Sequence, residues 1–365
     1  MHNSLLIESL PTVGGQQLIC VTLNAPKKLN ALTIEMVEIL LSKLPQWDVD
    51  PDVIAIIMRG QGERAFCAGG DIRFLYHAML DGNQTRAINF FQQEYRLNLM
   101  CHQLKTPLLA WGQGYVIGGG MGLLQGSAYR LGTSSSRLAM PEVSIGLFPD
   151  VGASWFLGHL PERMGLFMGL TGSQLNGYDA RRLGLLNGLL GEYDYPRLLE
   201  ALQQLSSQTL HAHHTAIRSA ITELEQECLT ITKMPASEID PIRNQITAAL
   251  KQPDLFTIIA SLLSLEGQGS TWLDTCLKVL RHASPTALHL TYRQLQEPPS
   301  KLSAAFDREY CLAINATYLG EFQEGIRALL IDKDQQPNWR YNDIEQVPNT
   351  WIERFYQFPT HIDTL

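Results

Sequence analysis

The stretch "TPLLAWGQGYVIGGGMGLL", residues 106–124, contains an apolar run, a cluster of glycines and a second apolar run. The apolar run that follows Pro107 predicts a buried strand. The glycines at 118–120 end this strand and leave room for a helix to begin. The stretch therefore predicts a unit in which a strand, a tight loop and a helix follow one another.

The same plan recurs twice. "DVIAIIMRGQGERAFCAGGD" (52–71) passes from a β-branched run through glycines into a loop, and "AYRLGTSSSRLAMPEVSIGLFPD" (128–150) is a third example. The alternating "QLICVTLNAP" (17–26) predicts an earlier strand. Within residues 85–107, apolar side chains recur at helical spacing, namely Ile88, Phe91, Tyr95 and Leu99. Strands separated by helices favour an α/β core.

The character of the sequence changes after about residue 155. Helical patterns dominate, including "DARRLGLLNGLL" (179–190), and the last 80 residues predict two helical stretches and an irregular tail rich in aromatic residues. We expect an α/β core over 1–195 and a helical C-terminal region over 196–365, with an insertion followed by capping or oligomerisation helices.

Composition excludes some classes of function. Of the 365 residues, 45% are hydrophobic and 18% are charged, which is typical of a globular protein. A net charge of -8 disfavours nucleic-acid binding. The six cysteines form no CxxC pair, the start lacks a basic signal segment, and no apolar run reaches the ~18 residues of a membrane span. We therefore expect a cytoplasmic protein with free thiols that neither enters a membrane nor binds nucleic acid.

Several familiar motifs are absent. The third glycine of a dinucleotide-binding GxGxxG would fall on Ile117 in one alignment and on Leu123 in another. There is no GxxxxGK[ST] phosphate loop, and Glu142 stands where a GxSxG elbow needs its first glycine. The "HAHH" segment (211–214) has no HExxH-like pairing, so we interpret it as the solvated face of a helix and expect no metal site.

The glycine clusters "CAGGD" (67–71) and "IGGGMG" (117–122) each follow a strand. Glycine lets backbone N–H groups approach a ligand, and two such donors on one carbonyl oxygen make an oxyanion hole. The glycines are equally compatible with tight turns and close packing of helix on sheet. The pattern by itself leaves both interpretations open.

Two acids occur in the apolar stretch "MPEVSIGLFPD" (140–150), and they are Glu142 and Asp150. Carboxylates in apolar surroundings are costly unless they are paired or used. Glu142 could instead cap a local turn, and Asp150 could cap the following helix. Glu94, on an apolar helix face, is a third candidate, with a buried ion pair as its structural alternative.

Together these segments resemble the crotonase (enoyl-CoA hydratase/isomerase) superfamily. The resemblance lies in "NAPKKLNALT" (24–33), "ERAFCAGGDI" (63–72), "GYVIGGGMGL" (114–123), "RLAMPEVSIGLFPDVGASWFLGHLP" (137–161) and "LTGSQLNGYDARRLGLLNGLL" (170–190), which occur in the family's order. It implies an α/β spiral of ββα units, acyl-CoA thioester substrates, and an oxyanion hole formed by the N–H groups of Gly70 and Gly119. It also implies that residues of two loops line the tunnel that binds the acyl-CoA, namely Lys28, Ala31, Ala68, Asp71 and Ile72. On the residues alone, Asp71 more simply fixes its own loop.

Hydratases of this superfamily hold a water with two glutamates, and the first of these positions is Gly122 here. The second is retained as Glu142. The chain is more similar to the 3-hydroxyisobutyryl-CoA hydrolase branch, through "QEYRLN" (93–98), "SPTALHLTYRQL" (284–295) and "EGIRALLIDKDQQPNW" (324–339). The resemblance implies a thioester hydrolase of valine breakdown. In it, Glu142 would act as nucleophile or base, and Asp150 and Glu94 would bind the substrate's 3-hydroxyl.

Two alternatives remain. An enoyl-CoA isomerase or hydratase could use Glu142 alone, and a non-catalytic acyl-CoA-binding protein could share the scaffold. No cofactor is expected, because coenzyme A is part of the substrate. The superfamily's preference for trimers suggests a trimer-based homo-oligomer, and the alternative is that the long helical half covers the surface that trimers use.

Overall fold

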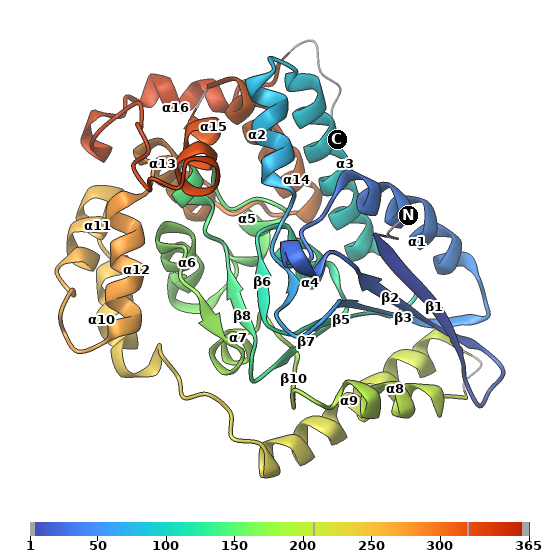
Figure 1. The fold of residues 1–365 in the computed structure, drawn as a ribbon. Helices are drawn as coiled ribbons and strands as arrows, with labels where there is room; N and C mark the ends of the chain where they lie inside the picture. The colour runs from blue at the N-terminus through green and yellow to red at the C-terminus, as the bar shows by residue number, and fades with distance from the viewer. Residues whose placement is uncertain (1–3, 207–208, 320, 360–364) are drawn as a thin grey trace. The chain divides into compact units, whose positions relative to one another are not determined.

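The computed structural model describes residues 4–206, 209–319, 321–359 and 365 (Figure 1). The chain forms two compact units from alternating segments. The first unit contains Met1–Gly70, Arg96–Leu138 and Leu175–Ser237, and the second contains Asp71–Tyr95, Ala139–Gln174 and Glu238–Leu365. These two units are defined by which segments pack together in space. The boundary near residue 195 was instead predicted from the change to helical sequence patterns, and it stays a prediction.

The first unit is built on a six-stranded sheet. Its strands lie in the order β1 (Leu5–Pro11), β2 (Gln17–Leu23), β3 (Val53–Gly60), β5 (Leu108–Gly112), β7 (Tyr129–Thr133) and β10 (Gly188–Leu190). β1 pairs with β2 in antiparallel fashion, and every other pair is parallel. Strands buried on both faces read as continuous apolar runs, which explains the "VIAII" of β3.

A second, smaller sheet follows the order β4 (Ala65–Cys67), β6 (Tyr115–Ile117), β8 (Arg137–Ala139) and β9 (Leu175–Asn176). Each long strand is therefore followed by a short one: β3 by β4, β5 by β6, and β7 by β8. After β6 a helix begins at the glycine cluster, α4 (Gly119–Gly126). The strand, glycine loop and helix that the sequence predicted are present, and the added short strand gives the ββα plan that the family resemblance implied.

The other helices of the first unit are α1 (Ile34–Val49), α7 (Gly177–Leu183), α8 (Tyr195–Gln203) and α9 (Leu210–Ile231), with the 3-10 turn η1 (Pro26–Lys28). α8 and α9 cover the sheet with a shared apolar face. Leu198 and Leu202 of α8 and Ile217 and Ile221 of α9 join the core cluster around Ile57. Burying each such side chain contributes about 1.5–3 kcal/mol.

The second unit is helical. It contains α2 (Ile72–Leu80), η2 (Glu142–Ile145), α5 (Ala153–Phe156), η3 (Pro161–Arg163), α6 (Met164–Thr171), η4 (Asp240–Ile242), α10 (Arg243–Leu250), α11 (Leu255–Leu263), α12 (Thr271–His282), α13 (Pro285–Gln296), α14 (Leu302–Leu319), α15 (Glu321–Ile326), the π-helical η5 (Arg327–Ile331), η6 (Ile344–Gln346) and α16 (Asn349–Phe355). Helix α3 (Gln84–Gln103) belongs to this unit as far as Tyr95 and to the first unit from Arg96.

Three sequence predictions need correction. Helix α7 ends at Leu183 because Gly184 turns left-handed with φ +87°, and the predicted helix at 188–190 is strand β10. The tail is not wholly irregular, since Trp351 and Phe355 lie on α16. In "HAHH", His213 is buried rather than solvated.

The six cysteines are free thiols with buried side chains, as predicted. Among the described residues, no cluster of three or more His, Cys, Asp or Glu side chains could hold a metal ion. None of the described helices combines the length and apolar character that crossing a membrane requires.

Candidate active site

The two glycine loops meet within the first unit. β4 and β6 pair in parallel, so the loops that follow them leave the same edge of the small sheet. A Cβ built on Gly69 would lie 3.6 Å from the backbone N of Gly119. A Cβ on Gly120 would lie 2.2 Å from the carbonyl oxygen of Cys67, so only glycine allows this approach.

This contact brings the backbone of Gly70 close to the start of α4. Gly119 is the first residue of α4, and the first N–H groups of a helix have no intrahelical acceptor. Among the backbone hydrogen bonds of the described residues that lie outside the regular helix and strand patterns, none has the N–H of Gly70 or Gly119 as its donor. The positive end of the α4 dipole favours a negative oxygen at this place. The loops can therefore supply backbone donors to an oxyanion.

The segment from Lys28 to Leu32 runs beside the same loop. The N–H of Leu32 donates to the carbonyl of Gly69 at 2.8 Å, and the N–H of Ala68 donates to the carbonyl of Leu29 at 3.0 Å. Asn30 fixes the segment, because its side chain donates to the carbonyls of Gln61 and Ala65. Lys28, Ala31, Ala68 and Gly70 are thus brought together, and Lys28 is exposed.

Asp71 and Ile72 begin α2 in the second unit. The Asp71 carboxylate accepts a hydrogen bond from the N–H of Phe74 at 3.2 Å and so caps this helix. A capping aspartate of this kind satisfies a backbone donor and orders its loop. Capping of α2 is therefore sufficient to explain why an aspartate occupies position 71.

In the second unit the three predicted acids are all buried. Glu142 is the first residue of η2 and 6% exposed, Asp150 is 5% exposed, and Glu94 is 3% exposed. Oδ2 of Asp150 accepts a hydrogen bond from the hydroxyl of Tyr95 at 2.6 Å. The side chain of Asp150 does not cap α5, contrary to the structural alternative considered for it.

Two carboxyl oxygens of this group lack partners. Oε1 of Glu94 and Oε2 of Glu142 are buried and have no hydrogen-bond partner within the part of the chain that the structure describes. No ion pair to Glu94 is found among the same residues, so the alternative of a buried ion pair has no support. Leaving a buried acceptor unpaired costs about 1–3 kcal/mol. Such atoms are suited to receive a polar group of a ligand.

Burial raises the pKa of all three acids, and the charge of Asp150 raises the pKa values of the two glutamates further. Burial, and then the charge of Asp150, raise the pKa of Glu94 well above its ordinary value. The same two causes raise the pKa of Glu142, with a smaller contribution from Glu94. Burial raises the pKa of Asp150 to about 6, against the hydrogen bond from Tyr95, which favours the ionised form. Asp150 is therefore the acid most readily ionised, and Glu94 holds its proton to higher pH.

Helix α15 packs against the backbone of η2. A Cβ on Gly325 would lie 2.3 Å from the carbonyl carbon of Ile145, so α15 lies directly on the backbone of η2. The N–H of Ser284 donates to the carbonyl of Val143, which fixes η2 further. The position of Glu142 is thus set by backbone contacts from distant segments.

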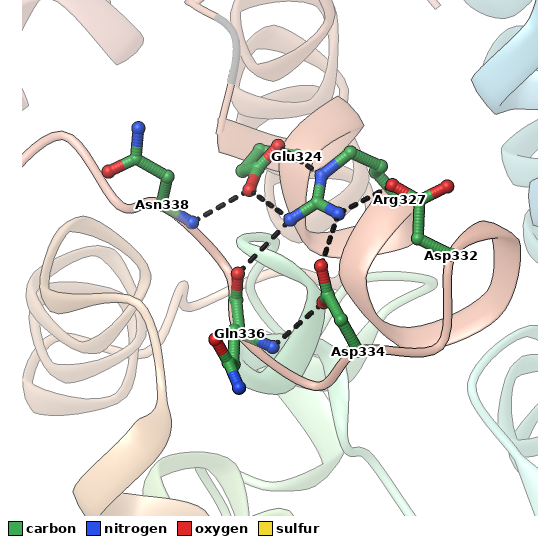
Figure 2. Close-up of polar contacts among 6 residues, drawn as sticks. All are labelled: Glu324, Arg327, Asp332, Asp334, Gln336 and Asn338. Carbon is green, nitrogen blue, oxygen red and sulfur yellow. Dashed lines mark hydrogen bonds and ion pairs between the residues drawn. The ribbon is translucent and has the colours of Figure 1, made fainter.

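Figure 2 shows how the chain after α15 is held. Arg327 forms paired hydrogen bonds with Glu324, at 2.9 and 2.8 Å, and also contacts Asp332 and Asp334. The same Arg327 donates to the carbonyl of Gln336. The segment 324–339 therefore packs through α15 on η2 and folds around the side chain of Arg327.

Sequence reasoning missed two residues of this site. Tyr95 was noted only as part of an apolar helical stripe, although its hydroxyl contacts Asp150. Glu309 on α14 was not singled out, yet it is fully buried and bonds to the turn that follows Asp150. Nothing in the spacing of the sequence connects Glu309 with a turn more than 150 positions earlier.

The comparisons with known proteins agree with one another. A family model described as enoyl-CoA hydratase/isomerase matches residues 18–356. The 3-hydroxyisobutyryl-CoA hydrolase, mitochondrial, of Homo sapiens is 36% identical over 328 residues, which are 90% of this chain and 83% of the human protein. The Gallus gallus protein of the same name is 33% identical, covering 94% of this chain and 87% of the relative.

Solved structures show the same architecture. An enoyl-CoA hydratase from Rhodobacter sphaeroides 2.4.1 has a TM-score of 0.82 and 31% identity, covering 97% of both chains. A carnitinyl-CoA dehydratase from Mycobacterium thermoresistibile has a TM-score of 0.83 and 27% identity, with the same coverage. The predicted spiral α/β fold with a helical C-terminal region is confirmed.

Proposed function

Because the chain belongs to the enoyl-CoA hydratase/isomerase (crotonase) superfamily and is an acyl-CoA thioester hydrolase, we propose that its substrate is a short 3-hydroxyacyl-CoA. The preferred compound is 3-hydroxyisobutyryl-CoA, as in valine breakdown, and 3-hydroxypropionyl-CoA is the nearest alternative. The observation that supports this most is the buried group of Glu94, Glu142 and Asp150, in which two carboxyl oxygens lack partners. A hydrocarbon acyl chain would leave the Glu94 oxygen unpaired, whereas a hydroxyl can pair with it, and the Glu142 oxygen can act on the thioester carbonyl or on water.

In this proposal Glu142 carries out the hydrolysis. Its carboxylate either attacks the thioester carbonyl or removes a proton from the attacking water. If Glu142 attacks directly, the C–S bond breaks, coenzyme A leaves as the thiol with a proton, and water then hydrolyses the acyl–glutamate anhydride to release the product and restore the Glu142 carboxylate. If Glu142 instead activates water, the water oxygen enters the product carboxylate directly as the C–S bond breaks and the thiol leaves. A general base works best with a pKa near the operating pH, and burial moves the pKa of Glu142 upward in that direction.

The oxygen of the thioester carbonyl becomes negative as the bond to the nucleophile forms. We assign its stabilisation to the N–H groups of Gly70 and Gly119. Losing one such donor typically costs about 2.7–4 kcal/mol of transition-state stabilisation. The proposal requires that Glu142 and these two amides act on the same carbonyl, which is a chemical requirement open to a kinetic test.

Asp150 and Glu94 are assigned to the 3-hydroxyl. A hydroxyl both donates and accepts, so it is best held by one ionised and one protonated carboxyl group. The hydrogen bond from Tyr95 favours ionised Asp150, and burial favours protonated Glu94. The substrate hydroxyl would then donate to Asp150 and accept from Glu94.

The competing function is addition of water to an enoyl-CoA, which the name of the Rhodobacter sphaeroides relative suggests. Against it stands Gly122, because the first of the two glutamates with which hydratases of this superfamily hold the water is missing at this position. A trimer-based assembly, the absence of a cofactor and a cytoplasmic location stay predictions.

The test is the release of free thiol from 3-hydroxyisobutyryl-CoA, followed with a thiol reagent. Isobutyryl-CoA, which differs only by the hydroxyl, is the matched control substrate, and hydration of crotonyl-CoA is measured in parallel. We expect fast thiol release from the hydroxylated thioester and a large preference over isobutyryl-CoA. Hydration of crotonyl-CoA that is faster than thiol release would refute the proposal.

A further inference from the structure

The turn that follows Asp150 contains a strained residue. Val151 is fully buried and has φ +54°, a conformation that is an outlier for a β-branched side chain. Strain of this kind costs roughly 1–3 kcal/mol and persists only where the surroundings hold it. Gly152 follows with φ +90°, so two left-handed residues separate Asp150 from α5. The direction of Asp150 therefore depends on whatever stabilises this turn.

Glu309 of α14 supplies that stabilisation. Its Oε2 accepts from the N–H of Gly152 at 2.6 Å, and its Oε1 accepts from the N–H of Ser154 at 2.8 Å and from the Ser154 hydroxyl. The helix α5 has no side-chain cap of its own, because Gly152 occupies the capping position. Glu309 thus acts as a cap contributed by a distant helix, and its side chain is 0% exposed.

Helix α14 also contacts Tyr95, the residue that donates a hydrogen bond to Asp150. A Cβ on Gly152 would lie 3.1 Å from Cζ of Phe306, so α14 lies directly on the turn. The Phe306 ring is 6.2 Å from the ring of Tyr95, whose hydroxyl donates to Asp150. The backbone after Asp150 and the partner of its side chain are therefore both fixed by α14.

We propose that Glu309 is a positioning residue for Asp150 and thereby sets the preference for a substrate that carries a 3-hydroxyl. The inference rests on the proposed function, in which Asp150 receives that hydroxyl. Glu309 touches no substrate in this account. Its loss would move the Asp150 carboxylate relative to the hydroxyl, and misplacement by about 1 Å can cost on the order of 10²-fold in rate.

The test compares Glu309→Gln with Ser154→Ala. A glutamine keeps the size of the side chain, but its NH₂ group must face one of the backbone donors, so at least one capping bond is lost. Ser154→Ala removes only the hydroxyl bond and keeps both backbone bonds. The readout is the ratio of kcat/KM for 3-hydroxyisobutyryl-CoA to that for isobutyryl-CoA, measured on the same preparation. This ratio does not depend on the fraction of folded enzyme.

We expect the ratio to fall by roughly 10- to 100-fold in Glu309→Gln and to stay within about twofold of wild type in Ser154→Ala. An unchanged ratio in Glu309→Gln, with both rates lowered alike, would show that Glu309 only stabilises the fold and would overturn the inference. If Glu309→Gln does not fold, the same ratio is measured in Glu309→Gln combined with Val151→Gly, since glycine adopts the turn without strain. There the inference requires a lower ratio than in Val151→Gly alone, and equal ratios would overturn it.

Asp150→Asn separates this inference from the proposed function. If Asp150→Asn lowers the ratio and Glu309→Gln does not, only the role of Glu309 is refuted. If wild type hydrolyses both thioesters equally and Asp150→Asn leaves the ratio unchanged, the proposed function itself is refuted, together with the inference that rests on it.

Discussion

The glycine loops of the first unit and the acid group of the second unit are built in opposite ways. The loops at 68–70 and 118–120 present backbone N–H groups and owe their contact to two short parallel strands. The acids present side chains, and their surroundings come from segments far apart in sequence, namely α3, η2, the turn at 150–152 and α14. One region is set by local backbone geometry and the other by tertiary packing.

The two regions should therefore respond differently to change. Backbone amides do not titrate, and only substitutions that alter the backbone can remove them. Buried carboxyl groups titrate, and a single isosteric substitution removes their chemistry while leaving the fold in place. Mutation and pH thus distinguish the contributions of the two regions.

The largest effect is expected from Glu142→Gln. The amide keeps the shape of the side chain but cannot act as nucleophile or base, so kcat for thiol release should fall roughly 10²- to 10⁴-fold. The melting temperature should not fall, because a buried carboxyl with a raised pKa is replaced by a neutral group. Hydrolysis at the wild-type rate would remove Glu142 from the mechanism.

The next largest effect is expected from Gly120→Ala. The added methyl would meet the backbone of Cys67 and push α4 away from the loop that carries Gly70. A lost oxyanion donor predicts a 10²- to 10³-fold fall in kcat, on the order seen at other such sites. Gly184→Ala is the matched control, because its Cβ meets nothing within 4 Å but its φ of +87° is strained. That control should lose stability and keep its rate, and an equal loss of rate in both variants would contradict the assignment.

A smaller effect concerns pH. Burial raises the pKa of Asp150 to about 6 and that of Glu309 to about 7, and it raises the pKa of Glu142. The folded state then binds protons more tightly than the unfolded chain, so these groups lower stability as the pH rises from about 4 to about 7. Activity should also rise with pH as Glu142 ionises, at a pH above the ordinary range of a glutamate because burial raises its pKa.

The measurement is the difference in melting temperature between Glu142→Gln and wild type from pH 5 to pH 8, with the acidic limb of kcat/KM recorded alongside. The melting temperature of Glu142→Gln should exceed that of wild type by an amount that increases as the pH rises. A difference that shrinks would contradict the direction of the pKa shift at Glu142.

The smallest effect is expected from Gly122→Glu, which restores the residue type that hydratases have at this position. Every residue of α4 is buried, so a new carboxylate there would be unpaired and held in its neutral form. Hydration of crotonyl-CoA should stay at the level of a Gly122→Ala control. Robust hydration would show that one missing carboxylate is all that separates this chain from a hydratase.

The sequence predicted the glycine loops of the first unit better than the acid group of the second unit. Glycine clusters after apolar runs indicated the strands and the start of α4, since these depend on local conformation. Spacing and apolar surroundings also identified Glu142 and Asp150 as unusual acids. The hydrogen bond from Tyr95 to Asp150 could not be predicted, because a tyrosine at helical spacing among apolar residues has the same sequence pattern as a core residue.

Other features could not be predicted because they depend on contacts between distant segments. Glu309 meets the turn at 152–154 only through the packing of α14. Strand β10 was taken for helix because the short run "GLL" carries no periodicity of its own, and its partner β7 lies 55 or more positions earlier. In both places tertiary pairing outweighs the local pattern.

The most direct test of the account is a double-mutant cycle between Glu142→Gln and Gly120→Ala, with kcat for thiol release from 3-hydroxyisobutyryl-CoA as the readout. Groups that act together on one reacting centre are strongly non-additive. We predict that the double variant is hardly slower than the slower of the two single variants, because both changes disable the same attack on one carbonyl. Rate losses that multiply fully would contradict a shared role for the backbone amides and the glutamate.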